Sequence, residues 1–581
     1  MLSPVMGNRV NACAISSLVL LWACWVVFVD LNSNRSSSTG KACNGRECKE
    51  NASRLVLQQR HQDSLAKLAD ENKYAGEDKP KREADSPLRS LPDSTRARSV
   101  EVEGREARND PATATAASIQ NASTSSEHGD ATEFSLKNDP GRLPWFIEEI
   151  RKGGFNKLRK LDLTGCLLNE LPAEICRLRS LEMLNLGNNS LSDLPQTFEN
   201  LVSLKILFFL GNQFSVIPAV LGKLTSLEIL SFKGNKLIDL GENLPVSLKS
   251  LVLTDNLLKS LPSSIGKLTD LQKIMLSNNK LSSLPAELAL CKKLELIRLS
   301  KNELKAIPKD IFDLPSLAWF AVGSNPMTPP VPSIRVPEQT VDQFEIFERL
   351  GKGASGKVYR AMMKETKEEV AIKFFHKFNA ISDGSPLDEL AISSIVNSSH
   401  VQRLLGVIRK PMLAAVTTIS RRSSKNLGSP PSFSTITRDT YRDFTMSATN
   451  CLKILQQVAS GLAAIHSAGV CHGDLYAHNI MADTATGWAQ ILDFGASFLF
   501  EKDAKDPLID GERVQRFDVL AFGRLILELA GHVENGNEGE GKEILDILKR
   551  TAQECLDTTV MSRPSASTIA RRLHASPKVS S

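Results

Sequence analysis

The sequence has little net charge and no cysteine spacing typical of a metal site. Lysine and arginine exceed aspartate and glutamate by only five among 581 residues, and the two signs are interleaved. A charge this small gives no indication of nucleic-acid binding. The ten cysteines are scattered along the chain. Cys43 and Cys48 could form a disulfide in an oxidising compartment, but free thiols explain them equally well.

Residues 12–29 form a long apolar run, interrupted only by Ser16 and Ser17. As a helix this run would span about 27 Å, enough to cross the apolar core of a bilayer. It is long for the apolar part of a signal peptide, and no small-x-small cleavage pair follows it. We therefore expect a retained transmembrane or signal-anchor helix after a short tail, residues 1–11. A cleaved signal peptide is the alternative.

Residues 30–140 show no apolar periodicity and are rich in serine, threonine and mixed charges. Such a composition buries too little apolar surface to offset the entropy cost of ordering the chain. We expect a disordered linker here. Its glycosylation triplets at Asn34, Asn51 and Asn121 would be used only in a secretory lumen.

From Leu158 onward leucine recurs with a period of 23 residues, broken once by a unit of 21 residues. Each unit follows L-x-x-L-x-L-x-x-N-x-L, and eight units are in phase. The pattern resembles the leucine-rich repeat family, which implies a solenoid over residues 141–328. Each unit would form a short strand and a turn. Because one unit cannot close a core alone, the stacked leucines would form one continuous core.

The repeat pattern also predicts an internal ladder of asparagine side chains that bond the turns of neighbouring units. Cys166 takes that place in the first unit. Residues 142–157, with Trp145, Phe146 and Ile150, would cap the open end. Leu-Pro pairs would direct the convex side, although Leu240-Gly241 departs from them in the short unit. The ladder residues are Asn189, Asn212, Asn235, Asn256, Asn279, Asn302 and Asn325.

Apolar side chains at outward strand positions would form a stripe on the concave face. A contiguous stripe of this kind indicates a docking surface for a protein partner. The alternative is that a neighbouring segment of the same chain folds back over it. The stripe residues are Met183, Ile206, Phe208, Ile229, Val252, Met275 and Trp319.

Residues 471–495 indicate a catalytic function. They begin with C-H-G-D-L-Y-A-H-N-I-M and end in I-L-D-F-G. Phosphoryl transfer needs an acceptor for a hydroxyl proton and oxygen ligands that hold Mg²⁺ against phosphates. Asp474 would be the base, Asn479 and Asp493 the metal ligands, and Gly495 would allow a tight turn after Asp493. The spacing resembles the catalytic loop and metal-binding motif of protein kinases.

Upstream motifs strengthen that resemblance. Gly351, Gly353, Gly356 and Val358 form G-x-G-x-x-G-x-V, whose backbone N–H groups would close over the phosphates of ATP. Ala371 and Lys373 lie in V-A-I-K, which would bring a lysine to the phosphates. Glu389 is the expected partner of Lys373, with Asp388 the less favoured one. Downstream, Asp518 would bond the catalytic-loop backbone and Arg563 matches a late arginine motif. The resemblance covers residues 344–575.

The chain departs from the kinase pattern at three places. Gly473 replaces the arginine that precedes the catalytic aspartate, which removes an acceptor for an activation-loop phosphate. Tyr476 stands where serine/threonine kinases carry a lysine near the γ-phosphate. No A-P-E motif lies between Gly495 and Asp518, so the activation segment is short. Glu512 could pair with Arg563 in its place, but its spacing does not fit the family. The Ser/Arg/Pro-rich residues 420–434 are interpreted as an insertion between the lobes.

A Pro-rich linker, residues 329–343, joins the repeats to this domain. It is too polar to cross a membrane, so both domains must lie on the same side. Because ATP is supplied in the cytosol, we expect both domains to be cytoplasmic. The basic residues Arg35, Lys41 and Arg46 after the apolar run also favour this orientation.

The predicted fold is an α/β leucine-rich repeat solenoid followed by a bilobal α+β kinase-like domain, behind an N-terminal membrane helix and a disordered tether. The favoured function is an ATP- and Mg²⁺-dependent protein kinase of serine/threonine type that acts on a protein substrate. A non-catalytic scaffold is one alternative, favoured by the short activation segment. A small-molecule phosphotransferase is another, because such enzymes share H-G-D-L-x-x-x-N.

Overall fold

The computed structural model describes residues 130–353, 355–376, 384–502, 508–534 and 538–575. The predicted tail, membrane span and disulfide, the three glycosylation triplets and most of the linker lie outside the described residues. Among the helices of the described ranges, none has both the length and the apolar character needed to cross a bilayer.

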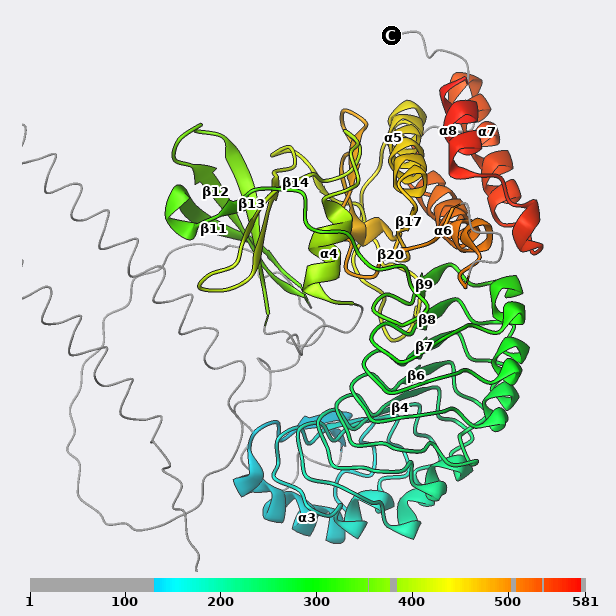
Figure 1. Cartoon of the computed structure of the whole chain (residues 1–581). Helices are drawn as coiled ribbons and strands as arrows, with labels where there is room; N and C mark the ends of the chain where they lie inside the picture. Colours follow the sequence, from blue (N-terminus) through cyan, green and yellow to red (C-terminus); the bar gives the residue numbers. More distant parts are fainter. Residues whose placement is uncertain (1–129, 354, 377–383, 503–507, 535–537, 576–581) are drawn as a thin grey trace, which may run out of the picture. The chain divides into compact units, whose positions relative to one another are not determined.

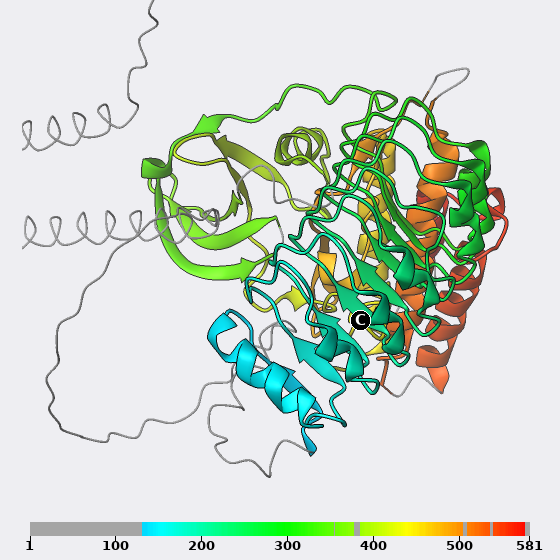
Figure 2. The same cartoon turned by 90° about the horizontal axis from the view of Figure 1, so that it is seen from below.

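A parallel nine-stranded sheet runs through the repeats, with its strands in chain order (Figures 1 and 2). Neighbouring units pair in the same register, so that Leu184 lies opposite both Leu161 and Leu207. The predicted repeat solenoid is confirmed. The strands are β1 (Glu133–Ser135), β2 (Lys160–Asp162), β3 (Met183–Asn185), β4 (Ile206–Phe208), β5 (Ile229–Ser231), β6 (Ser250–Val252), β7 (Lys273–Met275), β8 (Leu296–Arg298) and β9 (Trp319–Ala321).

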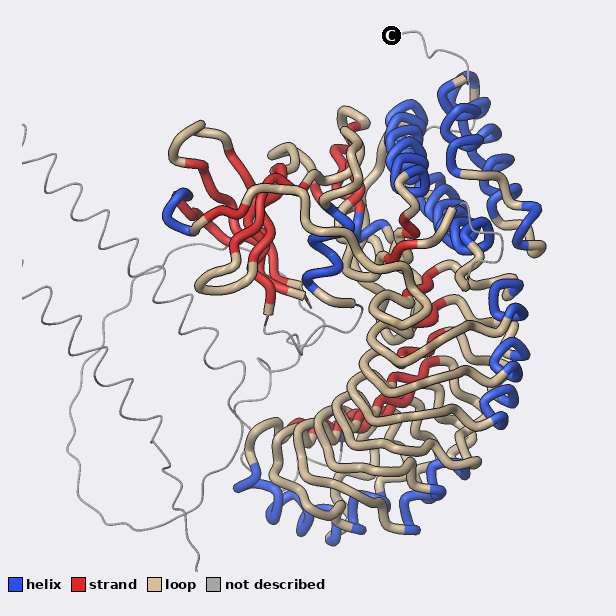
Figure 3. Tube along the Cα trace, viewed as in Figure 1, coloured by secondary structure: helices blue, strands red, loops and turns tan. Residues whose placement is uncertain are grey.

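Short 3₁₀ helices lie on the side of the solenoid opposite the strands (Figure 3). Each begins directly after a proline, whose fixed φ and missing N–H suit a first helical turn. In the described residues no such helix lies between β5 and β6, where Leu240-Gly241 replaces the Leu-Pro pair. The helices are η3 (Ala173–Arg177), η4 (Gln196–Asn200), η5 (Ala219–Lys223), η6 (Ser263–Lys267), η7 (Ala286–Leu290) and η8 (Lys309–Asp313).

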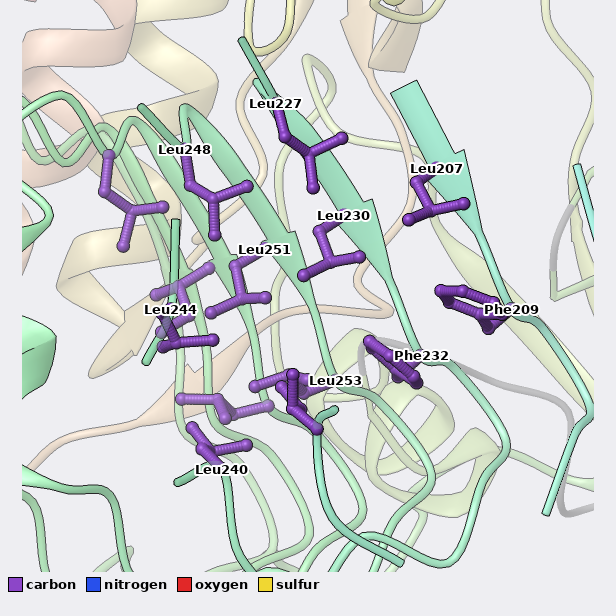
Figure 4. Close-up of a cluster of buried hydrophobic side chains, with 14 of the residues drawn as sticks. Leu207, Phe209, Leu227, Leu230, Phe232, Leu240, Leu244, Leu248, Leu251 and Leu253 are labelled. Atoms are coloured by element: carbon purple, nitrogen blue, oxygen red, sulfur yellow. The ribbon is translucent and has the colours of Figure 1, made fainter. Parts of the chain in front are cut away.

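Leucines fill the space between the strands and the convex side (Figure 4). Leu207, Leu230 and Leu251 occupy equivalent positions on three neighbouring strands and are fully buried. Phe209 and Phe232 form a second row, with stacked ring centroids 4.7 Å apart. Burial of each such side chain contributes about 1.5–3 kcal/mol to the free energy of folding. Because every row continues into the next unit, the repeats form one core.

The predicted asparagine ladder is present. In Asn212, Oδ1 accepts from the Leu191 N–H at 3.0 Å and Nδ2 donates to the Leu186 carbonyl at 2.9 Å. The other six ladder asparagines make the same Oδ1 bond. Cys166 occupies this position in the first unit, and its thiol donates to the Leu136 carbonyl at 3.1 Å. These bonds satisfy buried turn groups that would otherwise destabilise the fold.

The N-terminal end of the solenoid begins earlier than predicted. Strand β1 lies within the predicted disordered linker, so the boundary at residue 140 is wrong. Phe134 and Leu136 explain the difference because both are buried, and the Phe134 ring stacks 4.7 Å from Phe146. Phe146 lies on α3 (Leu143–Arg151), which follows η2 (Pro140–Arg142) and covers the first repeat as predicted.

A six-stranded sheet with the order β10-β14-β15-β13-β12-β11 forms the small lobe together with α4 (Pro386–Ser393). Its first strand and η9 (Val341–Gln343) lie inside the predicted linker, residues 329–343. The end of that linker is therefore part of the small lobe, because β10 pairs with β14. The strands are β10 (Glu338–Gln339), β11 (Phe344–Lys352), β12 (Gly356–Met363), β13 (Glu369–Phe375), β14 (Leu404–Ile408) and β15 (Ala414–Thr418).

The large lobe is helical. Its first helix matches the predicted apolar spacing, and Leu452, Leu455, Leu462 and Ile465 are all buried on it. The helices are α5 (Ala448–Ser467), α6 (Gly511–Ala530), α7 (Gly539–Cys555) and α8 (Ala566–His574), with the short turns η10 (Ala477–Asn479) and η11 (Val560–Ser562). Short strands accompany them: β16 (Lys425–Asn426), β17 (Val470–Cys471), β18 (Ile480–Asp483), β19 (Trp488–Ile491) and β20 (Phe498–Leu499).

The last repeats and the large lobe share their apolar cores. The ring of Phe320 on β9 lies 5.9 Å from Phe498 on β20 and 5.6 Å from Phe517 on α6. Leu296 and Trp319 belong to the same buried cluster as the residues of α5 and α6. The interface therefore resembles the interior of a domain.

The same interface shows what covers part of the concave apolar stripe. Trp319 is 2% exposed beneath the large lobe, and the ring of Phe208 lies 5.3 Å from Phe433 in the predicted insertion. At these positions a neighbouring segment does fold back over the stripe. Met183 and Ile206 on the earlier repeats are only partly buried.

Candidate active site

Three predicted charges lie together beneath the small lobe. The Nζ of Lys373 on β13 is 2.6 Å from Oε1 of Glu389 on α4 and 3.6 Å from Oδ1 of Asp493. Burial lowers the pKa of Lys373, but the charges of Asp493 and Glu389 outweigh burial and raise it overall. Burial likewise raises the pKa of Asp493, but Lys373, the Gly495 N–H and nearby histidines together outweigh burial and lower it. Lys373 and Asp493 therefore keep opposite charges at neutral pH.

Asp388, the less favoured partner of Lys373, contacts the repeat region instead. Its carboxylate accepts a hydrogen bond from the hydroxyl of Ser324 in the last repeat. Glu389 is 7% exposed and points inward from the same short helix, and burial raises its pKa. The choice of Glu389 over Asp388 as the lysine partner agrees with this geometry.

The glycine motif forms the hairpin between β11 and β12. Gly351 pairs with Val358, and Val358 in turn lies opposite Lys373 on β13. A side chain at position 356 would place its Cβ 2.3 Å from the Phe374 carbonyl oxygen, so glycine is required there. Ala371 is buried two residues before Lys373. The sheet therefore holds the predicted nucleotide-contacting residues on adjacent strands.

Asp474 and Asn479 lie against each other in the catalytic loop. The Nδ2 of Asn479 donates to Oδ2 of Asp474 at 2.8 Å and to the Asp474 carbonyl at 2.9 Å. These bonds use only the amide nitrogen of Asn479, and Oδ1 is the atom suited to a metal. The Asn479 carbonyl accepts at 2.8 Å from the N–H of Leu492, the residue before Asp493. This backbone bond holds Asn479 beside the residue that precedes Asp493, so it brings the two predicted metal ligands close together.

Asp518 anchors the start of the same loop, as predicted. Its Oδ2 accepts from the His472 N–H at 2.8 Å and its Oδ1 from the Gly473 N–H at 2.9 Å. His466 also contacts Oδ2, at 2.9 Å. Burial raises the pKa of Asp518, but these hydrogen bonds and the nearby histidines outweigh it and lower the pKa. A charged carboxylate therefore holds the loop from within the large lobe.

Asp439, in the segment before α5, supports the other end of the loop. Its Oδ2 accepts from the His478 N–H at 2.8 Å, and its Oδ1 lies 2.7 Å from Nδ1 of that histidine. No sequence motif indicates this contact. Asp439 lies between the predicted insertion, residues 420–434, and the predicted helix, in a stretch with no regular spacing, and the contact was therefore missed.

The repeats contact three successive residues of the catalytic loop. Arg298 on β8 donates from Nη1 to the Gly473 carbonyl at 2.8 Å and from Nη2 to Oδ1 of Asp474. Trp319 on β9 donates from Nε1 to the Leu475 carbonyl at 3.1 Å. The ring of Tyr476 stacks on that of Trp319, with centroids 4.2 Å apart. Tyr476 is therefore buried against the repeats.

Gly473 is explained by the same contact. Its φ is +72°, and a Cβ would lie 2.4 Å from the Phe320 carbonyl oxygen and 3.1 Å from that of Ala496. An arginine cannot occupy this position while β9 packs on the loop. The departure from the kinase pattern thus reflects the docked repeats.

The segment after Gly495 pairs with the start of the catalytic loop, and Arg563 contacts the repeats. Strand β20 pairs with β17 immediately before the catalytic loop, and Ser497 donates to the His472 carbonyl at 2.8 Å. Arg563 is fully buried and donates to the carbonyls of Asp557, Arg516 and Pro315, of which Pro315 lies in the repeats. The Glu512 alternative is absent from these contacts. A repeat carbonyl therefore supplies part of the anchorage of this arginine.

Arg298 is the main functional candidate that the sequence did not reveal. It occupies an outward strand position at which the neighbouring units carry Met275 and Ala321. One signal was available, because a lone arginine interrupts an apolar stripe in a chain whose catalytic loop lacks its usual basic residues. Only the fold brings β8 to that loop.

Comparisons with known proteins agree with both halves of the chain. The model of the protein kinase domain matches residues 344–515. Models of leucine-rich repeats match residues 151–242, 246–304 and 271–327.

Individual relatives are similar over one part of the chain. The serine/threonine-protein kinase pakH of Dictyostelium discoideum is 33% identical over 201 residues, which is 32% of this chain and 37% of that protein. The smooth-muscle myosin light chain kinase of Gallus gallus is 30% identical over 166 residues, which is 28% of this chain and 8% of that protein. A solved leucine-rich repeat protein of Leptospira interrogans is 31% identical, covering 30% of this chain and 45% of that one, with a TM-score of 0.30. The chain thus spans well under half the length of these curated relatives.

The packing of the repeats on Gly473 predicts an asymmetry between two glycines. Gly241 also has a positive φ, +65°, but its Cβ position meets no atom of the described residues within 4 Å. Gly241→Ala should cost only the backbone strain, about 1–2 kcal/mol. Gly473→Ala should cost about 1–3 kcal/mol more, because its Cβ also collides with rigid backbone. Urea unfolding of the full chain measures both, and equal losses would contradict the packing of β9 on the catalytic loop.

Proposed function

The chain joins a leucine-rich repeat region to a protein kinase domain, and on this premise we propose that it transfers the γ-phosphoryl group of ATP to a serine or threonine hydroxyl of a protein. The observation that carries the proposal is the charge arrangement at the lobe junction. Lys373 pairs with both Glu389 and Asp493 on one side, and Asp474 and Asn479 are hydrogen-bonded on the other. Each of these residue types suits one part of phosphoryl transfer.

The residues present fit a magnesium-bound nucleotide. The pKa of Asp493 is lowered, because Lys373 and the Gly495 N–H are the main groups that offset its burial, and the Oδ1 of Asn479 is not the atom used in its bonds to Asp474. Carboxylate and amide oxygens are the ligands that Mg²⁺ prefers. When bound there, the ion would neutralise negative charge on the phosphates.

In the proposed reaction each protein group has one task. Lys373, oriented by Glu389, donates hydrogen bonds to phosphate oxygens. The substrate hydroxyl oxygen forms a bond to the γ-phosphorus while the bond from that phosphorus to the leaving ADP oxygen breaks. The hydroxyl proton passes to the carboxylate of Asp474, whose side chain keeps 23% of its surface exposed and so can accept it. The products are a phosphorylated protein and ADP.

We also propose that the earlier repeats recruit a protein partner or substrate. Met183 and Ile206 are only partly buried on the concave strands β3 and β4. The corresponding face of β8 and β9 is covered by the large lobe, so these earlier strands offer the available part of the stripe. Capture of a labelled substrate should weaken when Ile206 is replaced by aspartate, and unchanged binding would exclude this surface.

The activity is tested by comparing active-site variants for phosphate transfer to a serine/threonine peptide library and to free alcohols and sugars. Asp474→Asn should lower kcat by about 100-fold or more, because it removes the proton acceptor. Lys373→Met should lower it by a similar factor, since it removes a charge that contacts phosphate. Lys425→Met, at an exposed lysine on β16, is the matched control and should retain wild-type activity.

The outcomes separate the alternatives. Transfer to peptides that is lost in Asp474→Asn supports a protein kinase. Transfer only to free alcohols or sugars would identify a small-molecule phosphotransferase. Wild-type protein with no transfer, and no difference from Asp474→Asn, would identify a scaffold.

We further propose that residues 12–29 anchor the chain in a membrane with both domains in the cytoplasm. The length and apolarity of that run support the anchor, and the polar linker between the domains supports their shared side. Protease added to intact microsomal vesicles should digest both domains without detergent. Protection of both domains, with glycosylation at Asn34, Asn51 or Asn121, would reverse the orientation. Release of the chain by high salt would exclude the anchor.

A further inference from the structure

Arg298 lies where it can control the geometry of the proposed catalytic base. Its Nη2 contacts Oδ1 of Asp474, while Asn479 donates to Oδ2 of the same carboxylate at 2.8 Å. The carboxylate is therefore held from both sides and its plane is fixed. The side chain of Arg298 is 3% exposed, whereas that of Asp474 is 23% exposed. The guanidinium is thus buried behind the carboxylate, and an edge of Asp474 remains open to a substrate.

The backbone around Asp474 is held by the same strands. Arg298 donates to the Gly473 carbonyl and Trp319 donates to the Leu475 carbonyl. The residue on each side of Asp474 is therefore fixed by a repeat strand, and Asp474 itself by a repeat side chain. A loop held at three successive residues by β8 and β9 has little freedom to change conformation during a reaction cycle.

The contact between the repeats and the catalytic loop is either an inhibitory plug or a permanent structural support. Removing a plug would raise kcat, and removing a support would lower it. A removable inhibitory plug would have to separate from the large lobe easily. Here the contact continues into a buried apolar interface, in which Phe320 packs against Phe498 and Phe517. Polar contacts cross the same interface, because Arg524 on α6 donates to Glu295 and to the Ser316 carbonyl of the repeats. Separation would expose this whole surface to water, which favours a permanent structural contact.

We propose that Arg298 of the repeat region is a positioning residue for Asp474, so that the catalytic loop is completed by a side chain from outside the kinase domain. The proposal rests on the kinase activity proposed above. Arg298 supplies a cation that fixes the carboxylate and a second N–H that fixes the Gly473 carbonyl. This assignment accounts for a loop that carries glycine at 473 and a buried tyrosine at 476 in place of basic residues.

The test measures kcat, the KM for ATP and the calorimetric affinity for Mg·ATP in the full-length protein. Arg298→Ala should lower kcat by about 100-fold, because a misoriented base accepts the proton poorly. The KM for ATP and the binding affinity should stay within about threefold, since the lysine side of the site is unchanged. Arg298→Lys should recover part of kcat, because an ammonium can pair with Asp474 but cannot also hold the Gly473 carbonyl in a fork.

Two comparisons keep the result interpretable. Arg513→Ala removes an ion pair between α6 and Asp313 of the repeats, away from the loop, and should leave kcat unchanged. The double variant Arg298→Ala, Asp474→Asn should be no slower than Asp474→Asn alone, because Arg298 acts through that residue. If Arg298→Ala fails to fold, Arg298→Lys and Arg298→Gln are assayed in the same cycle.

Each outcome decides a separate question. Loss of kcat with intact nucleotide binding, partial recovery by lysine and no added loss in the double variant support the positioning role. A rise in kcat in Arg298→Ala would overturn it in favour of autoinhibition. Unchanged kcat would also overturn it. If wild type and Asp474→Asn are equally inactive, the proposed kinase function fails instead.

Discussion

The burial of Phe320 between the repeats and the large lobe is the constraint on which the rest of the structure depends. Its ring contacts Phe498 and Phe517, and its carbonyl oxygen closes on Gly473. One residue of β9 thus contacts the catalytic loop, the segment that follows it and the central helix α6. The two regions identified by their motifs consequently share one interior at this point.

Several departures from the kinase pattern follow from that constraint. Gly473 cannot carry a side chain because the Phe320 backbone occupies the space. Tyr476 is stabilised by stacking on Trp319. Arg563 lacks an A-P-E glutamate and donates to the Pro315 carbonyl in the repeats. The catalytic loop is thus held in part by Arg298, Trp319 and Phe320 of the repeats.

The sequence was sufficient for features that depend on local periodicity or a motif. The repeat core, the asparagine ladder, α5, the Lys373–Glu389 pair and the Asp518 anchor all follow from spacing, and the structure contains each of them. Boundaries were less predictable. Strands β1 and β10 lie in stretches read as linkers, because two or three residues that pair at a sheet edge leave almost no periodic signal.

Contacts between distant residues could not be predicted in this way. Arg298 and Asp474 are 176 positions apart, and nothing in either motif encodes their approach. Asp439 and His478 pose the same difficulty, since one lies in a segment without a repeat or a motif. Their positions depend on how β8, β9 and the segment before α5 pack on the large lobe.

The claim that the last repeats and the large lobe form one interior is tested most directly by native-state hydrogen exchange of the full chain at increasing denaturant. The slowest amides of β8 and β9, such as that of Trp319 bonded to the Glu295 carbonyl, should open with the same free energy and the same denaturant dependence as those of α6. Exchange of α6 at denaturant concentrations that leave β8 and β9 protected would contradict it.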